Sequence, residues 1–237
     1  MAEQSLKDIG PVVLVGAGKM GLAMARGWIA GGLPPDRLVL VDPFAGEPAQ
    51  AFAQETGARL LKSADGVLTH VLVLAVKPQN MIPVLQQVLP VVGKHTLVIS
   101  IAAGISLHTL AAGLDTERVV RAMPNTPAQL GKGITGAVGL SVSEADQEVA
   151  NLLLRAAGDV AWFEAETMID AVTYVHRIIG LPLEEALRMA SLYPAEALGV
   201  DKERGRIAPG LRADLVHLSD ELSVRGTLIG GETAYAA

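Results

Sequence analysis

This chain of 237 residues has no cysteine. Without a thiol it can form no disulfide framework, no cysteine nucleophile and no thiolate metal site. Aromatic residues are also scarce, at 3%, whereas glycine occurs 25 times. That balance suits closely packed units of strands and helices, and it argues against a β-sandwich built on aromatic core anchors.

Long apolar runs and an excess of basic charge are missing as well. No run reaches the length of a membrane span, and residues 1–10 lack the basic region and apolar stretch of a signal peptide, so we expect a cytoplasmic protein. The net charge of −6 argues against a nucleic-acid-binding surface, which would be basic. We therefore expect a small-molecule substrate as partner and neither nucleic acid nor membrane, and the sequence is compatible with a homo-oligomer.

The sequence also lacks the patterns of two common kinds of catalytic site. None of the five histidines stands at the i, i+4 spacing of a helical zinc site, so we expect no metal. Ser100, Ser106 and Ser191 lack the G-x-S-x-G setting of a hydrolase nucleophile. The residues alone single out no catalytic group.

What the chain does contain, from residue 11 to about residue 163, is a series of short apolar runs that alternate with segments of helical spacing. Continuous apolar runs are typical of strands buried on both faces of a parallel sheet. We therefore predict an α/β fold, a Rossmann-type doubly wound parallel sheet with right-handed crossovers. The expected strands are residues 12–15, 38–41, 71–76, 97–101, 119–123, 134–140 and 160–163, and the expected helices are residues 20–30, 47–56, 106–113 and 143–157.

The character of the sequence changes after Thr173. Two amphipathic helices are expected in this part, one around residues 175–179 and one around residues 183–190, with a break at residues 180–182. Short strand-like pieces follow at residues 205–207, 213–218 and 224–230. The predicted organisation is an N-terminal extension at 1–10, the Rossmann-type domain at 11–173 and a short helical and β-strand tail at 174–237.

A glycine-rich motif follows the first expected strand and opens the first expected helix, which is the setting that a dinucleotide-binding G-x-G-x-x-G loop requires. Its residues are Gly16, Ala17, Gly18, Lys19, Met20 and Gly21. In such a loop Gly16 makes the tight turn, Gly18 lets the backbone approach a pyrophosphate, and Gly21 allows close packing of helix on strand. The alternative interpretation is a glycine-rich turn without a ligand.

Asp42 follows the second expected strand, about twenty residues after the glycines. An acidic side chain at this place accepts hydrogen bonds from the adenosine ribose, and its charge opposes a 2′-phosphate, so it favours NADH over NADPH. Arg37 or Lys62 could fold over such a phosphate and compensate. The other interpretation is a turn aspartate before Pro43.

Two further loops leave expected strands at their carboxyl ends, where ligands bind in open α/β sheets. The first contains Ala75, Val76, Lys77 and Pro78. It makes Lys77 a candidate for the ribose or phosphate region of a cofactor, although a lysine before proline is equally an ordinary solvated residue. The second loop, residues 123–127, presents Asn125 and Thr126 between prolines, which suits a nicotinamide carboxamide or a small substrate, or else is a rigid turn.

Taken together, these motifs resemble pyrroline-5-carboxylate reductase. The resemblance is carried by residues 13–21, 75–78, 100–104 and 121–127, and it extends from residue 11 to about residue 173. It implies an oxidoreductase that transfers a hydride from NAD(P)H to the imine carbon of 1-pyrroline-5-carboxylate, giving L-proline in proline biosynthesis. The cofactor supplies the chemistry in such an enzyme, and the protein supplies geometry and electrostatics.

The tail departs from that family, whose members continue with a Ser-Gly-Ser-Gly-Pro-like segment and a long helical substrate domain. Here Tyr174, Val175 and His176 follow, and residues 181–195 and 210–216 resemble the carboxyl end of an amidohydrolase, N-acetylglucosamine-6-phosphate deacetylase. The barrel and the His-x-His of that second family are missing, so deacetylase activity is not implied. Two interpretations stay open: a reductase, and a fused or truncated module that binds dinucleotide with little or no turnover.

Overall fold

The computed structural model describes residues 5–124, 133–164, 166, 182–192, 196, 201–203, 206–213, 215–218, 224–229 and 231–236. The chain forms two compact units, Met1–Ile169 and Asp170–Ala237. None of the described helices has the length and apolar character needed to cross a bilayer.

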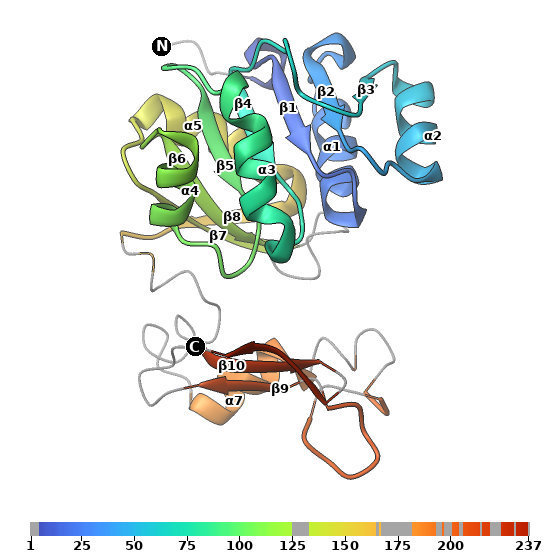
Figure 1. Cartoon of the computed structure of the whole chain (residues 1–237), viewed down its shortest axis with the longest axis vertical. Helices are drawn as coiled ribbons and strands as arrows, with labels where there is room; N and C mark the ends of the chain where they lie inside the picture. Colours follow the sequence, from blue (N-terminus) through green and yellow to red (C-terminus); the bar gives the residue numbers. More distant parts are fainter. Residues whose placement is uncertain are drawn as a thin grey trace. The chain divides into compact units, whose positions relative to one another are not determined.

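The first unit is built on an eight-stranded sheet with the order β3-β2-β1-β4-β5-β6-β7-β8 (Figure 1). Neighbouring strands pair in parallel except for β6 and β7, which are antiparallel. The strands are β1 (Val12–Val15), β2 (Leu38–Val41), β3 (Arg59–Leu61), β4 (Val71–Leu74), β5 (Leu97–Ser100), β6 (Val119–Pro124), β7 (Gly133–Gly139) and β8 (Gly158–Trp162).

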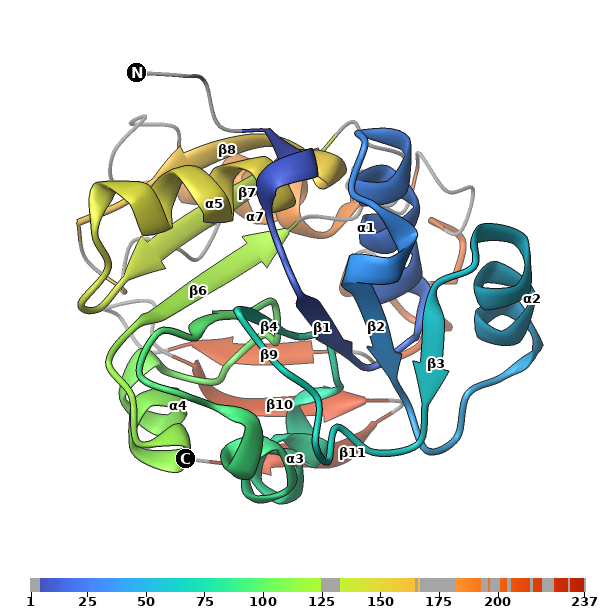
Figure 2. The same cartoon turned by 90° about the horizontal axis from the view of Figure 1, so that it is seen from above.

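Helices cover both faces of this sheet, with α1 and α5 on one side and α3 and α4 on the other (Figure 2). All four residues of β1 are buried because each face of the strand meets helices. The α-helices are α1 (Lys19–Ala30), α2 (Glu47–Thr56), α3 (Met81–Val88), α4 (Leu107–Leu114) and α5 (Glu144–Leu154). Short 3₁₀ helices are η1 (Leu6–Asp8), η2 (Pro35–Arg37), η3 (Pro78–Asn80), η4 (Leu89–Val91) and η6 (Arg155–Ala157).

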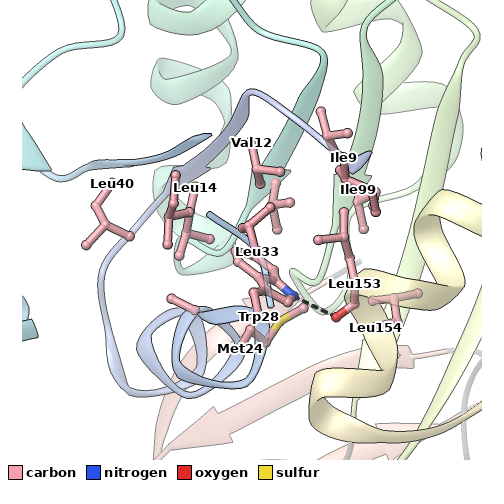
Figure 3. Close-up of a cluster of buried hydrophobic side chains, with 14 of the residues drawn as sticks. Ile9, Val12, Leu14, Met24, Trp28, Leu33, Leu40, Ile99, Leu153 and Leu154 are labelled. Carbon is pink, nitrogen blue, oxygen red and sulfur yellow. Dashed lines mark hydrogen bonds between the residues drawn. The ribbon is translucent and has the colours of Figure 1, made fainter. Parts of the chain in front are cut away.

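Trp28 of α1 is the centre of the core on the first face. Its ring is fully buried beside Leu14 of β1, and its indole Nε1 donates a hydrogen bond of 2.7 Å to the carbonyl oxygen of Leu153 in α5 (Figure 3). A Cβ added to Gly27 would lie 2.6 Å from the Cβ of Ala156, so glycine is needed where α1 approaches η6. These contacts hold the helix that carries the glycine motif firmly on the sheet.

The core on the second face joins the alternate residues of the same strands to α3 and α4. Val13 and Val15 of β1 meet Leu85 of α3 and Leu110 of α4 there. Because successive side chains of a strand point to opposite faces, one apolar run serves both cores. The predicted doubly wound α/β fold is thereby confirmed.

Helix α3, strand β3 and the short 3₁₀ helices η1 to η4 of the first unit were not expected from the sequence. Helix α3 carries Pro83 in its first turn, where proline is tolerated because the amide it lacks has no helical partner. Strand β3 is only three residues long and partly exposed. Strand β4 ends at Leu74, so Ala75 and Val76 lie in the loop and not in the expected strand.

The sequence predicted a parallel sheet, but β6 and β7 pair antiparallel, so the sheet is not parallel throughout. Only residues 125–132 connect β6 to β7. A parallel connection needs a crossover of about a dozen residues or more, usually including a helix, so this short link gives an antiparallel pair.

The second unit contains helix α7 (Leu183–Ala190) and a three-stranded antiparallel sheet. Its strands β9 (Leu215–Leu218), β10 (Val224–Ile229) and β11 (Glu232–Ala236) have the order β11-β10-β9. The expected helix at 183–190 and the strands near 215–218 and 224–229 are confirmed. Strand β11 was not expected, residues 206–207 are not in a strand, and the helix expected around 175–179 lies outside the described residues.

Candidate dinucleotide-binding site

The order of the strands reverses between β1 and β4. The chain proceeds from β1 outward to β2 and β3, then returns to add β4 on the other side of β1. At such a switch point the loops after the two central strands separate and leave a crevice at the carboxyl edge of the sheet. Here these loops are residues 16–21 and 75–78, so the fold brings two of the predicted site segments together.

The first and third glycines of the motif are required by the fold itself. Gly16 has a positive φ of +96°, and a Cβ on it would lie 2.7 Å from the carbonyl oxygen of Ala75. A Cβ on Gly21 would collide with the carbonyl oxygen of Gly16. Both positions thus allow β1, α1 and the loop after β4 to approach one another, with or without a ligand.

Gly18 differs from its neighbours. Its φ of −76° and ψ of −174° are open to any residue, and no atom of the described residues lies within 4 Å of the place that a Cβ would take. Gly18 is exposed. Neither the backbone conformation nor packing among the described residues requires a glycine here, whereas the close approach of a ligand to the protein backbone does.

The amino end of α1 is prepared for an anion. Gly18 is its N-cap and supplies no side-chain cap, whereas Ser106 and Ser143 cap α4 and α5 through their hydroxyl oxygens. The first turn of α1 contains no acidic residue, and it begins with the exposed Lys19. Uncapped amides and the helix dipole favour a phosphate at this end.

Asp42 connects the glycine loop to the turn after β2. Its Oδ2 accepts a hydrogen bond of 2.9 Å from the amide of Ala17, and its Oδ1 accepts one of 2.9 Å from the amide of Phe44. A carboxylate oxygen has lone pairs for more than one donor, so both oxygens can accept further bonds. Asp42 is therefore a turn residue and a neighbour of the glycine loop at once, and a contact with ribose stays a prediction.

Of the two basic residues proposed to offset Asp42, the structure excludes Arg37. Arg37 lies before β2, at the amino edge of the sheet, and its guanidinium donates to the carbonyl oxygen of Lys7 at 2.9 Å. It cannot reach a phosphate at the carboxyl edge. Lys62 follows β3 directly, beside the bond of 3.0 Å from the Asp42 amide to the Leu61 carbonyl oxygen, and it is exposed.

The remaining predicted residues divide into two groups. Ala75 and Val76 are half-buried and border Gly16, Met20 is half-buried in the first turn of α1, and Lys77 and Pro78 are exposed where η3 begins. Asn125 and Thr126 lie outside the described residues. In the described part of the chain, no group of three or more histidine, aspartate or glutamate side chains could hold a metal ion.

A partly buried ion pair at the same edge of the sheet was not predicted from the sequence. Arg121 of β6 is 8% exposed, and its guanidinium donates to Glu166 Oε1 at 3.0 Å. The same oxygen accepts the amide of Leu107 at 2.8 Å, at the start of α4. Glu166 lies 45 residues from Arg121 in a segment without strand or helix periodicity, so no local pattern could have indicated the pair.

Comparison with known proteins identifies the family of the chain that carries this site. Residues 11–104 match the family described as NADP oxidoreductase coenzyme F420-dependent. The pyrroline-5-carboxylate reductase of Pseudomonas aeruginosa is 36% identical over 222 residues, which cover 89% of this chain and 79% of that protein. The enzyme of Glycine max is 31% identical over 254 residues, covering 94% of this chain and 92% of that protein. This chain belongs to the pyrroline-5-carboxylate reductase family.

A solved pyrroline-5-carboxylate reductase, that of Coxiella burnetii, has a similar fold. It superposes with a TM-score of 0.65 at 28% identity, over 80% of this chain and 72% of that one. The expected oxidoreductase of the pyrroline-5-carboxylate reductase kind is thereby confirmed, and the match to an NADP oxidoreductase family supports a nicotinamide cofactor.

The tail is similar to proteins of two families. The alignment with the Pseudomonas pyrroline-5-carboxylate reductase covers 89% of this chain, so it must extend beyond residue 173 into the tail. Residues 145–234 also match the amidohydrolase family, in agreement with the expected likeness of the tail to an amidohydrolase. The predicted boundary between residues 173 and 174 stays a prediction.

Proposed function

We propose that this chain is a pyrroline-5-carboxylate reductase that binds a reduced nicotinamide dinucleotide at the carboxyl edge of its eight-stranded sheet. The observation that carries the proposal is Gly18, a glycine that the fold does not need, placed where a ligand would meet the uncapped end of α1. The relatives of this chain in Pseudomonas aeruginosa and Glycine max are named pyrroline-5-carboxylate reductases.

Different residues of the site bind different parts of the dinucleotide. The amides at the start of α1 hold the pyrophosphate, and Gly18 leaves room for it. Asp42 accepts hydrogen bonds from the adenosine ribose and, by like charge against a 2′-phosphate, favours NADH over NADPH. When bound, the reduced nicotinamide supplies a hydride for the imine carbon, whose nitrogen becomes an amine by taking up a proton. The protein orients the two reactants and lowers the entropic part of the barrier.

The glycine motif is tested by Gly18→Asp. An aspartate N-cap stabilises a helix, so thermal stability should not fall, while the added side chain blocks the pyrophosphate and repels it. NADH binding, followed by cofactor fluorescence, should weaken at least tenfold. The matched control is Gly46→Asp, which places the same side chain at the N-cap of α2 in nearly the same conformation, with φ −77° and ψ 174°.

An unchanged NADH affinity in Gly18→Asp would remove the glycine motif from the proposal. The activity is tested by following NADH oxidation with and without the cyclic imine. Oxidation that depends on the imine supports the reductase. Binding of NADH without such oxidation supports the alternative of a dinucleotide-binding module.

A further inference from the structure

Phe44 is the most exposed large apolar side chain in the described part of the chain, at 91%. The other two phenylalanines are covered, since Phe52 is fully buried and Phe163 packs on the core. A lone exposed apolar residue needs no explanation by itself. The place of Phe44 in the fold is what makes it informative.

The backbone of Phe44 is tied to the candidate site. Its amide donates to Asp42 Oδ1 at 2.9 Å, and the other oxygen of the same carboxylate accepts the amide of Ala17 in the glycine loop. The turn that presents the phenyl ring is therefore fixed relative to the glycine loop. It leads from β2 to α2 beside the edge strand β3 (Figure 2).

We propose that Phe44 is the stacking platform for the adenine of the cofactor. This inference rests on the proposed function, in which Asp42 holds the adenosine ribose. The base is bonded directly to that ribose, so it must lie close to the turn that begins at Asp42. An aromatic ring two residues further on offers the flat apolar face that a purine prefers.

Stacking of this kind explains why a phenylalanine stays uncovered by the protein. A base has a π-face of its own and can cover the ring, which the described residues of the first unit leave 91% exposed. Adenine is also the part of the dinucleotide farthest from the hydride. Phe44 should therefore change the affinity for the cofactor and not the chemical step.

The test compares ligands that contain adenine with one that does not, on the full chain. Phe44→Ala should weaken the binding of NADH and of ADP-ribose about tenfold, within the range measured for loss of base stacking. Turnover supported by reduced nicotinamide mononucleotide, which lacks adenosine, should stay unchanged. Phe44→Tyr keeps the ring and should bind NADH like the parent protein.

Leu68→Ala is the matched control because Leu68 is 68% exposed and precedes the amino end of β4, at the opposite edge of the sheet. It should leave every affinity unchanged. NADH affinity equal to the parent in Phe44→Ala would overturn the stacking role alone, and a change of oligomeric state in that variant would assign the ring to a second copy of the chain instead. Equal losses with the mononucleotide would also overturn it. Failure of the parent protein to bind NADH would overturn the proposed function as well.

Discussion

Asp42 shows how one side chain serves both fold and ligand. Its carboxylate accepts two amides, from Ala17 and Phe44, and it would meet a 2′-phosphate with like charge. We expect NADH to bind more tightly than NADPH by about 1 to 2 kcal/mol, the scale of a partly desolvated like-charge contact. Asp42→Ser should narrow this difference, as measured by titrations of both cofactors. Equal affinities in the parent protein would leave Asp42 as a turn residue only.

Thr135 is a residue whose polar group the described structure does not use. The side chain is fully buried on β7, and its Oγ1 has no hydrogen-bond partner within the described residues. An unpaired buried hydroxyl costs about 1 to 3 kcal/mol, so Thr135→Val should raise the free energy of unfolding by about 1 kcal/mol in urea denaturation.

Thr96 is the control for this substitution. It is equally buried, but its hydroxyl donates to the Thr69 carbonyl oxygen and accepts the Gly93 amide, both at 2.9 Å. Thr96→Val should therefore lower the free energy of unfolding by about 1 to 2 kcal/mol. Similar losses in the two variants would contradict the difference between the hydroxyls.

Helix α5 depends on a charged cap. Asp146 accepts the amide and hydroxyl of Ser143, and it forms an ion pair with Arg118. Burial raises the pKa of Asp146, but the hydrogen bonds from Arg118 and Ser143 together outweigh burial and hold the pKa below its usual value. Because the folded pKa is depressed, the stabilisation is complete above about pH 4 and is lost as the pH falls through the folded pKa.

Asp146→Asn should accordingly lower the free energy of unfolding by about 2 kcal/mol at pH 7, and the difference from the parent should shrink toward pH 3. Urea denaturation at both pH values measures it. Glu144→Gln, an exposed acidic residue in the same turn, should change stability by no more than about 0.5 kcal/mol. A loss in Asp146→Asn that is the same at both pH values would show that the charge is not involved.

The elements that the sequence predicted are those with local signals. Ser106 and Ser143 indicated the starts of α4 and α5, Gly57 indicated the end of α2, and apolar runs indicated the central strands. Helix α3 was not predicted, because Pro78 and Pro83 lie just before it and in its first turn. The direction of β7 depended on the length of a connection and not on periodicity, and the pair Arg121–Glu166 depended on tertiary structure.

The candidate site divides in the same way. The spacing of the glycines predicted a dinucleotide-binding loop. Only the surrounding atoms show that Gly16 and Gly21 have no room for a Cβ, whereas Gly18 does. Asp42 was found by its distance from the motif. The hydrogen bond from the Ala17 amide to Asp42 and the exposure of Phe44 could not be predicted from the sequence, because both depend on how the turn after β2 folds back.

Among the described residues of the whole molecule, each unit has a sheet of its own, with eight strands in the first unit and three in the second. The described residues of the second unit form a three-stranded sheet and helix α7, which by themselves offer little core, so we expect this unit to unfold at lower urea than the first. NADH should raise the stability of the first unit alone, by about 2.7 kcal/mol at a hundred times its Kd. Hydrogen exchange across a urea series, analysed for peptides of each unit, measures both effects. Simultaneous unfolding of the units, with NADH shifting both, would show that they form one cooperative structure.

The bond from Trp28 to Leu153 spans 125 residues of sequence. A ribosome therefore releases α1 long before it has made the helix that α1 must meet. Until α5 emerges, the apolar face around Trp28 lacks the part of its cover that α5 provides, and it stays partly exposed through most of the synthesis of the first unit. We therefore expect the nascent chain to be prone to aggregation until residue 153 has left the ribosome.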